Sequence, residues 1–119
     1  MRVKVQDLAP SCLTRHRGNQ AYQTLLKMDD GSQIEVELDG AEILSLSFLD
    51  ELVFRVNQTG AGDRLVLVSE NPDHIGKLAR ISGFRGVTIR RMSNGRPEPI
   101  PPERSSAPEA VAFAGRPPE

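Results

Sequence analysis

The feature that most constrains the fold is a run of four consecutive apolar residues, Leu65-Val66-Leu67-Val68. Two glycines, Gly60 and Gly62, precede the run. Behind it comes Asn71-Pro72-Asp73, which offers a capping side chain, a proline for the first helical position and an acid for the first turn. A short apolar run between such signals predicts a strand buried on both faces in the middle of a sheet. The chain must therefore build a sheet with other elements packed against it.

Two further segments show clear periodicity. Residues 33–38 alternate strictly between polar and apolar side chains, which predicts a strand with one buried face. Leu49, Leu52, Val53 and Val56 fall at the i, i+3, i+4 and i+7 positions of one helical stripe. We place the start of that helix at Ser47, because Ser47 and the acid three residues later form an approximate capping box.

Shorter patterns complete the order of the elements. They predict a first strand at 2–6, a second short strand near Leu13, and a helix at 18–28 that ends before an Asp-Asp-Gly-Ser turn. They also predict a helix from Asn71 to a left-handed cap at Gly83, and a last strand at 87–90. Strands that alternate with helices in this way indicate an α/β fold. We expect a small mixed sheet of four to five strands with about three helices packed against it.

The prolines divide the chain into two parts. Seven of the nine lie in the last 27 residues, where large apolar side chains are few. Such a segment buries too little surface to offset the entropy lost on ordering. We therefore predict one domain at 1–92 and a disordered, proline-rich C-terminal tail at 93–119.

Composition limits the classes of partner and compartment. Fifteen basic and sixteen acidic residues give a net charge of −1, which disfavours general binding to nucleic acid. No apolar run is long enough for a membrane-spanning helix, and the N-terminus lacks the apolar core of a signal peptide. The single cysteine, Cys12, forms no internal disulfide. We expect a cytoplasmic protein that does not bind membranes.

Known catalytic and cofactor motifs do not match the chain. The glycines at 60–62 and 83–86 fit neither dinucleotide nor phosphate-loop spacing, and Cys12 with His16 lacks the second close pair of a metal site. No serine lies in a nucleophile elbow. Asp50 and Glu51 are adjacent, so on a helix they point about 100° apart and do not form an acid/base pair. We expect no enzymatic activity, no cofactor and no metal, and we interpret the two acids as first-turn charges.

Residues 34–52 carry a more specific pattern: a strand, a turn with Gly40, a short apolar segment, and Ser47-Phe48-x-Asp50-Glu51-Leu52 at the start of a helix. This pattern resembles the STAS-like domain family of unknown function. The resemblance extends over about residues 1–91. The first acid of the turn, usually aspartate in that family, is Glu37 here.

The resemblance implies a non-catalytic regulatory module that acts by binding another protein. True STAS domains bind an ATPase of the histidine-kinase (GHKL) type and are switched by serine phosphorylation. Their acceptor position falls on Leu46 here, so the flanking Ser45 and Ser47 become the candidate phosphate acceptors. The expected partner-binding residues are Ser45, Leu46, Ser47, Phe48, Asp50 and Glu51. The alternative is a sensor of a small ligand or nucleotide that uses the helix N-terminus at Ser47 as an anion site.

Overall fold

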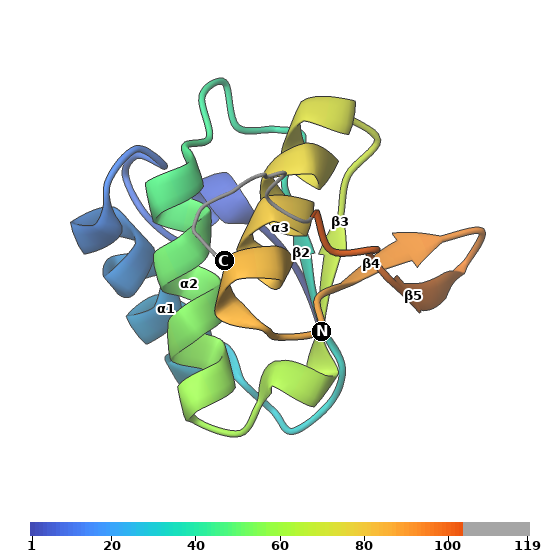
Figure 1. Ribbon diagram of the computed structural model, residues 1–119. Helices are drawn as coiled ribbons and strands as arrows, with labels where there is room; N and C mark the ends of the chain where they lie inside the picture. The colour runs from blue at the N-terminus through green and yellow to red at the C-terminus, as the bar shows by residue number, and fades with distance from the viewer. Residues whose placement is uncertain (104–119) are drawn as a thin grey trace.

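A five-stranded sheet carries three helices on one of its faces (Figure 1). The structure is a computed structural model that describes residues 1–103. The strands and helices, in chain order, are β1 (Arg2–Lys4), α1 (Arg15–Met28), β2 (Ile34–Glu37), α2 (Leu46–Gln58), β3 (Leu65–Val68), α3 (Pro72–Arg85), β4 (Arg90–Ser93) and β5 (Arg96–Pro99). Short 3-10 turns, η1 (Val5–Asp7) and η2 (Gly62–Arg64), follow β1 and precede β3.

The sheet has the simplest order available to alternating strands and helices. β1, β2, β3 and β4 are parallel neighbours in that sequence, and β5 returns antiparallel along β4. Parallel neighbours joined by right-handed crossovers place every connecting helix on the same face. Figure 1 shows this arrangement, with the β4–β5 hairpin projecting beyond the helices.

The core lies between the helices and this one face of the sheet. Val3, Val36 and Leu67 occupy adjacent positions on neighbouring strands, and all three are buried. The predicted stripe on α2 is buried against them, including Leu52 and Val56. The other side of β1 and β2 is charged, where Arg2 Nε lies 3.1 Å from Glu35 and 3.3 Å from Glu37.

The predicted fold class is confirmed, whereas several boundaries are wrong. The strand at 65–68 is the central strand of the sheet. The first helix begins at Arg15, before the predicted Gly18, because the Thr14 side chain accepts a hydrogen bond from the Arg17 amide and caps the helix there. Leu13 lies in the loop directly before this cap, so the short strand predicted near it is wrong. The left-handed residue that ends α3 is Gly86, with a φ of 67°, and Gly83 lies inside the helix.

The predicted start of a disordered tail at Ser93 is also wrong. β5 pairs with β4 through residues 96–99, and Ile100 is only 3% exposed. The Glu103 amide then donates a hydrogen bond to the Ala79 carbonyl of α3. The domain therefore continues to Glu103, and the rest of the predicted tail, residues 104–119, lies outside the described residues.

A tight turn explains why the chain forms a hairpin here. Asn94 and Gly95 both have positive φ, 52° and 81°, as a two-residue type I′ turn requires. The prolines at 97 and 99 are accommodated because β5 is an edge strand, where a missing N–H on the solvent side costs no ladder bond. Within residues 1–103, no helix has the length and apolar content needed to cross a membrane.

Candidate functional site

The N-cap of α2 lies two residues before the predicted one, and this shift changes the roles of two serines. Ser45 has extended backbone angles, and its Oγ accepts a hydrogen bond of 3.1 Å from the Phe48 amide. Ser45 is therefore the N-cap, and Ser47 lies inside the first turn. The capping box predicted at Ser47 is wrong, because the cap residue needs the extended conformation that Ser45 adopts.

Ser45 also joins two loops that are distant in sequence. Its Oγ donates a hydrogen bond of 2.7 Å to the Leu13 carbonyl, and its amide donates one of 2.9 Å to the Cys12 carbonyl. The loop before α1 is thereby fixed beside the loop before α2. Between them lies a groove of about 260 Å³, lined by residues 9–13 and 40–43 together with Gln6.

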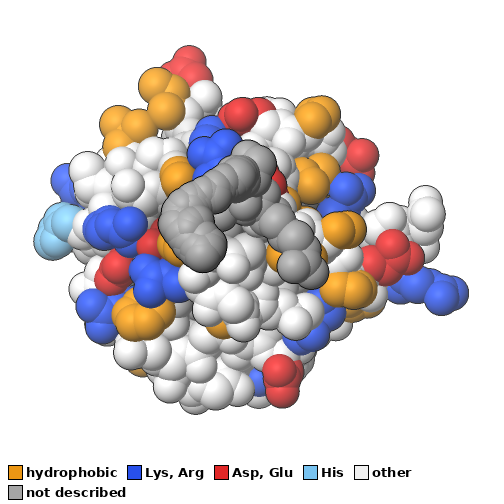
Figure 2. All heavy atoms as spheres, viewed as in Figure 1, with side chains coloured by type: hydrophobic (Ala, Val, Ile, Leu, Met, Phe, Trp, Pro, Cys, Tyr) orange, Lys and Arg blue, Asp and Glu red, His pale blue; other side chains and the backbone are white. Residues whose placement is uncertain are grey.

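Two large apolar side chains on this groove are exposed. Leu13 is 47% exposed and Ile43 is 62% exposed, and they come from opposite walls. Figure 1 shows the loop between β2 and α2 projecting from the end of the molecule, and in Figure 2 hydrophobic side chains lie near its tip. Phe48, which we expected to add to this apolar area, is fully buried, because its position on α2 turns it into the core. Leu46 is half-buried.

Asp50 has a different role from the one the sequence suggested. Its side chain is buried between the three helices and is bound by two arginines. Arg85 makes a two-pronged contact, with Nε 2.8 Å from Oδ1 and Nη2 2.7 Å from Oδ2, and Arg15 Nη1 lies 2.6 Å from Oδ2. Asp50 is therefore not the exposed first-turn charge that the sequence predicted. Because it is fully buried, it is not accessible to a partner protein.

The arginines lower the pKa of Asp50, and neighbouring residues of α2 also make contacts with arginine. Hydrogen bonds from Arg85, followed by those from Arg15, keep the pKa of Asp50 below its ordinary value despite burial. The Arg85 guanidinium also lies 4.5 Å from the centre of the Phe54 ring. Glu51, half-buried, accepts a 2.7 Å hydrogen bond from Arg55. In Figure 2, the surface over α1 and α2 shows Lys and Arg side chains gathered together with acidic side chains among them.

A third cluster, which sequence reasoning missed, lies at the carboxyl ends of β2 and β3. The Ser69 hydroxyl contacts Asp39 Oδ1 and lies 3.2 Å from His74 Nδ1, which is itself 3.2 Å from Asp39 Oδ1. The Glu70 amide donates to Asp39 Oδ2 at 2.7 Å. Asp39 and Ser69 follow adjacent parallel strands, so this proximity was detectable in principle once the strand order was known.

These are the residue types of a hydrolytic triad in a different arrangement. In a triad, the serine and the acid contact opposite nitrogens of the histidine ring. Here both face Nδ1, and Ser69 and His74 are buried. Burial acts to raise the pKa of Asp39, but hydrogen bonds from the Glu70 amide, Ser69 and His74 outweigh it and lower the pKa. The cluster fastens the loop after β2 to the start of α3.

The structure separates the six predicted partner-binding residues into three groups. Ser45, Leu46 and Ser47 are half-buried at the start of α2, close in sequence to the groove residues 40–43, Glu51 is half-buried further along α2, and Phe48 and Asp50 are in the interior. Leu13 and Ile43 are the neighbours that sequence analysis missed. In the part of the chain from 1 to 103, no three His, Cys, Asp or Glu side chains are grouped to hold a metal ion.

Comparisons with models of protein families, with curated proteins and with solved structures find no match for this chain.

Proposed function

We propose that the protein is a regulatory module that acts by binding another protein through its α2 N-terminal surface, defined as Leu13, Ile43, Ser45, Leu46 and Ser47. The observation that carries the proposal is the pair of large apolar side chains exposed on opposite walls of one groove. Apolar side chains gathered at one place on a surface favour contact with a partner.

The size and support of the groove favour a protein over a small molecule. Its volume of about 260 Å³ is below the range of roughly 300–1,000 Å³ typical of drug-sized ligands. One or two partner side chains would fit that space. The two hydrogen bonds from Ser45 fix the walls relative to each other, so that little order would have to be gained on binding.

Charges near the groove are mixed. Glu42 lines it, and Arg15, in the first turn of α1 beside His16 and Arg17, is already paired with Asp50. The exposed apolar pair, and not charge, is therefore the feature that a partner would recognise. The resemblance to STAS-like domains makes an ATPase of the histidine-kinase type the first partner to test.

The alternative, an anion bound at the start of α2, has less support. The Phe48 amide already donates to Ser45, and Arg15, the arginine that lies nearest Asp50 from α1, is paired with that carboxylate. An anion site needs free amides and an available cation in the same place.

The test compares substitutions on the surface with a matched one elsewhere. Ile43→Asp and Leu13→Asp each place a charge on the groove, and Met28→Asp places one at an exposed apolar residue at the end of α1. Proteins captured from the native cell are identified, purified and titrated against all four chains, each checked for an unchanged melting temperature. We expect Kd to rise at least tenfold, about 1.4 kcal/mol, for the two groove variants alone. Equal binding by Met28→Asp and the groove variants would reject the proposal.

A further inference from the structure

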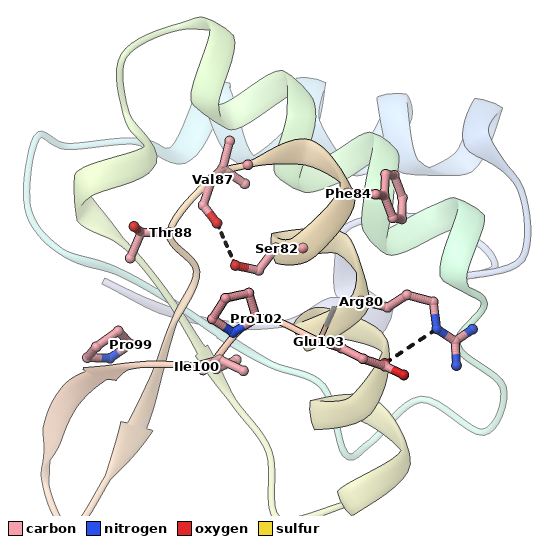
Figure 3. A pocket seen from close by; sticks show the side chains of 11 residues that line it. Arg80, Ser82, Phe84, Val87, Thr88, Pro99, Ile100, Pro102 and Glu103 are labelled. Carbon is pink, nitrogen blue, oxygen red and sulfur yellow. Dashed lines mark hydrogen bonds and ion pairs between the residues drawn. The ribbon is translucent and has the colours of Figure 1, made fainter. Parts of the chain in front are cut away.

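A second and larger groove runs between the C-terminal half of α3 and the segment after β5 (Figure 3). Its volume is about 870 Å³, and it is independent of the surface at the start of α2. Its walls combine apolar side chains, among them Phe84 and Val87, with the polar Arg80, Thr88 and Glu103, and Gly83 lies on the α3 side.

One aromatic side chain in this groove is without cover in the described residues. Phe84 is 58% exposed although it lines the groove from α3. The Arg85 guanidinium lies 5.9 Å from the centre of its ring and leaves much of the ring free. An exposed phenyl ring beside a hollow of this size favours an occupant that covers the ring.

The backbone after β5 packs closely against α3 at one side of this groove. The Glu103 amide donates to the Ala79 carbonyl at 2.9 Å, and the Glu103 carboxylate lies 3.7 Å from Arg80 Nε. A Cβ at residue 83 would collide with the Glu103 carbonyl oxygen, so glycine is needed there for the chain to cross α3 so closely. The described chain therefore ends inside the groove, as one of its walls.

Sixteen residues, 104–119, follow from that point, and they contain one apolar stretch, Ala-Val-Ala-Phe-Ala at 110–114. Six residues lie between Glu103 and Ala110, and the seven steps along the chain give a reach of up to about 25 Å. Glu109 comes directly before the stretch and has the charge to meet Arg80. We propose that residues 110–114 of the same chain bind in this groove, with Phe113 packed against Phe84.

Tethering favours this occupant over a separate molecule. Attachment through a short segment of chain gives the attached residues an effective concentration in the millimolar range. A weak contact of one aromatic and one valine side chain is therefore enough to fill the groove much of the time. Any other protein that recognises Phe84 would first have to displace this segment, which makes the contact autoinhibitory for that face.

The test uses the full chain with a nitroxide label. Gly115→Cys supplies the attachment site just beyond the apolar stretch. Cys12 is buried, and burial raises the pKa of its thiol, so the reagent should spare it. The wild-type chain treated with the same reagent is the control for this. In ¹⁵N NMR spectra, we expect the amide signals of Phe84, Val87 and Thr88 to lose most of their intensity through paramagnetic broadening.

Substitutions then test whether the groove is responsible. Phe84→Asp in the labelled chain should restore the signals of Val87 and Thr88, and Leu26→Asp, at an exposed apolar residue on α1, should not. Phe113→Asp provides a second way to break the contact without altering residues 1–103, and it too should restore them. Broadening that is spread evenly, that appears on another face, or that survives both Phe84→Asp and Phe113→Asp would overturn the proposal.

A mixing experiment separates the same chain from a second copy. Nitroxide-labelled chains without ¹⁵N are mixed with ¹⁵N chains that carry no label. We expect the signals of Phe84, Val87 and Thr88 to keep their intensity in the mixture. Broadening there would mean that the segment of another molecule fills the groove, which would overturn the intramolecular contact.

Discussion

The Ser45 hydroxyl makes two hydrogen bonds at once, accepting from the Phe48 amide and donating to the Leu13 carbonyl. It therefore caps α2 and also fixes the loop that leads into α1. Ser45→Glu, the substitution that a purely surface position would invite as a test of partner binding, would break both bonds. Loss of binding in that variant would not distinguish an interface from a damaged loop, so Ile43 and Leu13 are the better probes.

The first prediction follows from this double role. Ser45→Ala should lower the free energy of unfolding by about 1–2 kcal/mol, because loss of a cap alone typically costs about 1 kcal/mol and a second bond is lost with it. Ser47→Ala, at the second residue of the helix, should change the free energy of unfolding by less than about 0.5 kcal/mol. Urea titration followed by circular dichroism measures both. A larger effect at Ser47 than at Ser45 would place the cap where the sequence pattern put it.

At the scale of elements, a single glycine sets how closely α1 and α2 approach. A Cβ at residue 18 would lie 2.7 Å from the Phe48 carbonyl oxygen and 2.9 Å from Glu51 Cβ. The obstacle is backbone, so the helices would have to separate to make room. This contact also positions Arg15, three residues earlier on α1, within reach of Asp50.

The second prediction compares this glycine with another helical one. Gly18→Ala should destabilise the protein by about 1–3 kcal/mol through overpacking. Gly76→Ala on α3, where an added Cβ meets nothing within 4 Å, should stabilise it by about 0.5–1 kcal/mol through reduced entropy of the unfolded chain. Thermal unfolding of the two variants gives the comparison. Stabilisation by both would show that α1 and α2 are not in contact at Gly18.

The third prediction concerns the last hairpin and its anchor. Ile100 is buried directly after β5, so Ile100→Ala should lower the free energy of unfolding by about 2–5 kcal/mol. Its exposed neighbour Pro101 provides the control, and Pro101→Ala should change stability by less than about 0.5 kcal/mol. Truncation after Met92 should lower the melting temperature markedly because it removes β5 and Ile100 together. A truncated chain with an unchanged melting temperature would mean that the domain ends at β4.

At the scale of the whole molecule, periodicity predicted the layers but not their details. Alternation at 33–38 and the apolar run at 65–68 locate two neighbouring strands, because burial of one or both faces leaves a direct mark on the sequence. The hairpin was missed because its prolines argue against a strand, although Asn94-Gly95 is a strong turn signal. The prolines and the turn are compatible because β5 lies at the edge of the sheet, a position that the sequence does not reveal.

The candidate site was less predictable for a different reason. Its surface joins Leu13 to Ile43, and the buried carboxylate of Asp50 joins α1 to α3, so each depends on contacts between residues that are far apart in the chain. Residue type alone indicated that Asp50 was a solvated charge and that Phe48 was available for contact. Both turn inward because α2 is covered on two sides, by α1 and by α3. That packing is a property of the assembled fold.

The last prediction concerns acid stability, because three carboxylates join segments that are distant in sequence. Asp29 receives two hydrogen bonds of 2.8 Å from Arg64, Asp39 binds the loop after β3, and Asp50 binds Arg85 and Arg15. Each has a pKa below its ordinary value, for Asp29 and Asp50 chiefly because of hydrogen bonds from arginine. A lowered pKa in the folded state means that the unfolded chain binds protons more readily. The stabilisation is therefore complete above the ordinary aspartate pKa of about 3.9 and is lost as pH falls below it.

Urea titrations at a series of pH values between neutral and about pH 3 would show this as a falling free energy of unfolding on the acid side. Asp50→Asn should be less stable than wild type at neutral pH and should lose less stability on acidification, since one of the three carboxylates no longer titrates. Glu98→Gln, at an exposed residue of β5, should follow the wild-type curve. If Asp50→Asn instead ran parallel to wild type at every pH, the pKa of Asp50 would be the same in the folded and unfolded chains. The two arginines would then contribute nothing specific to holding the three helices together.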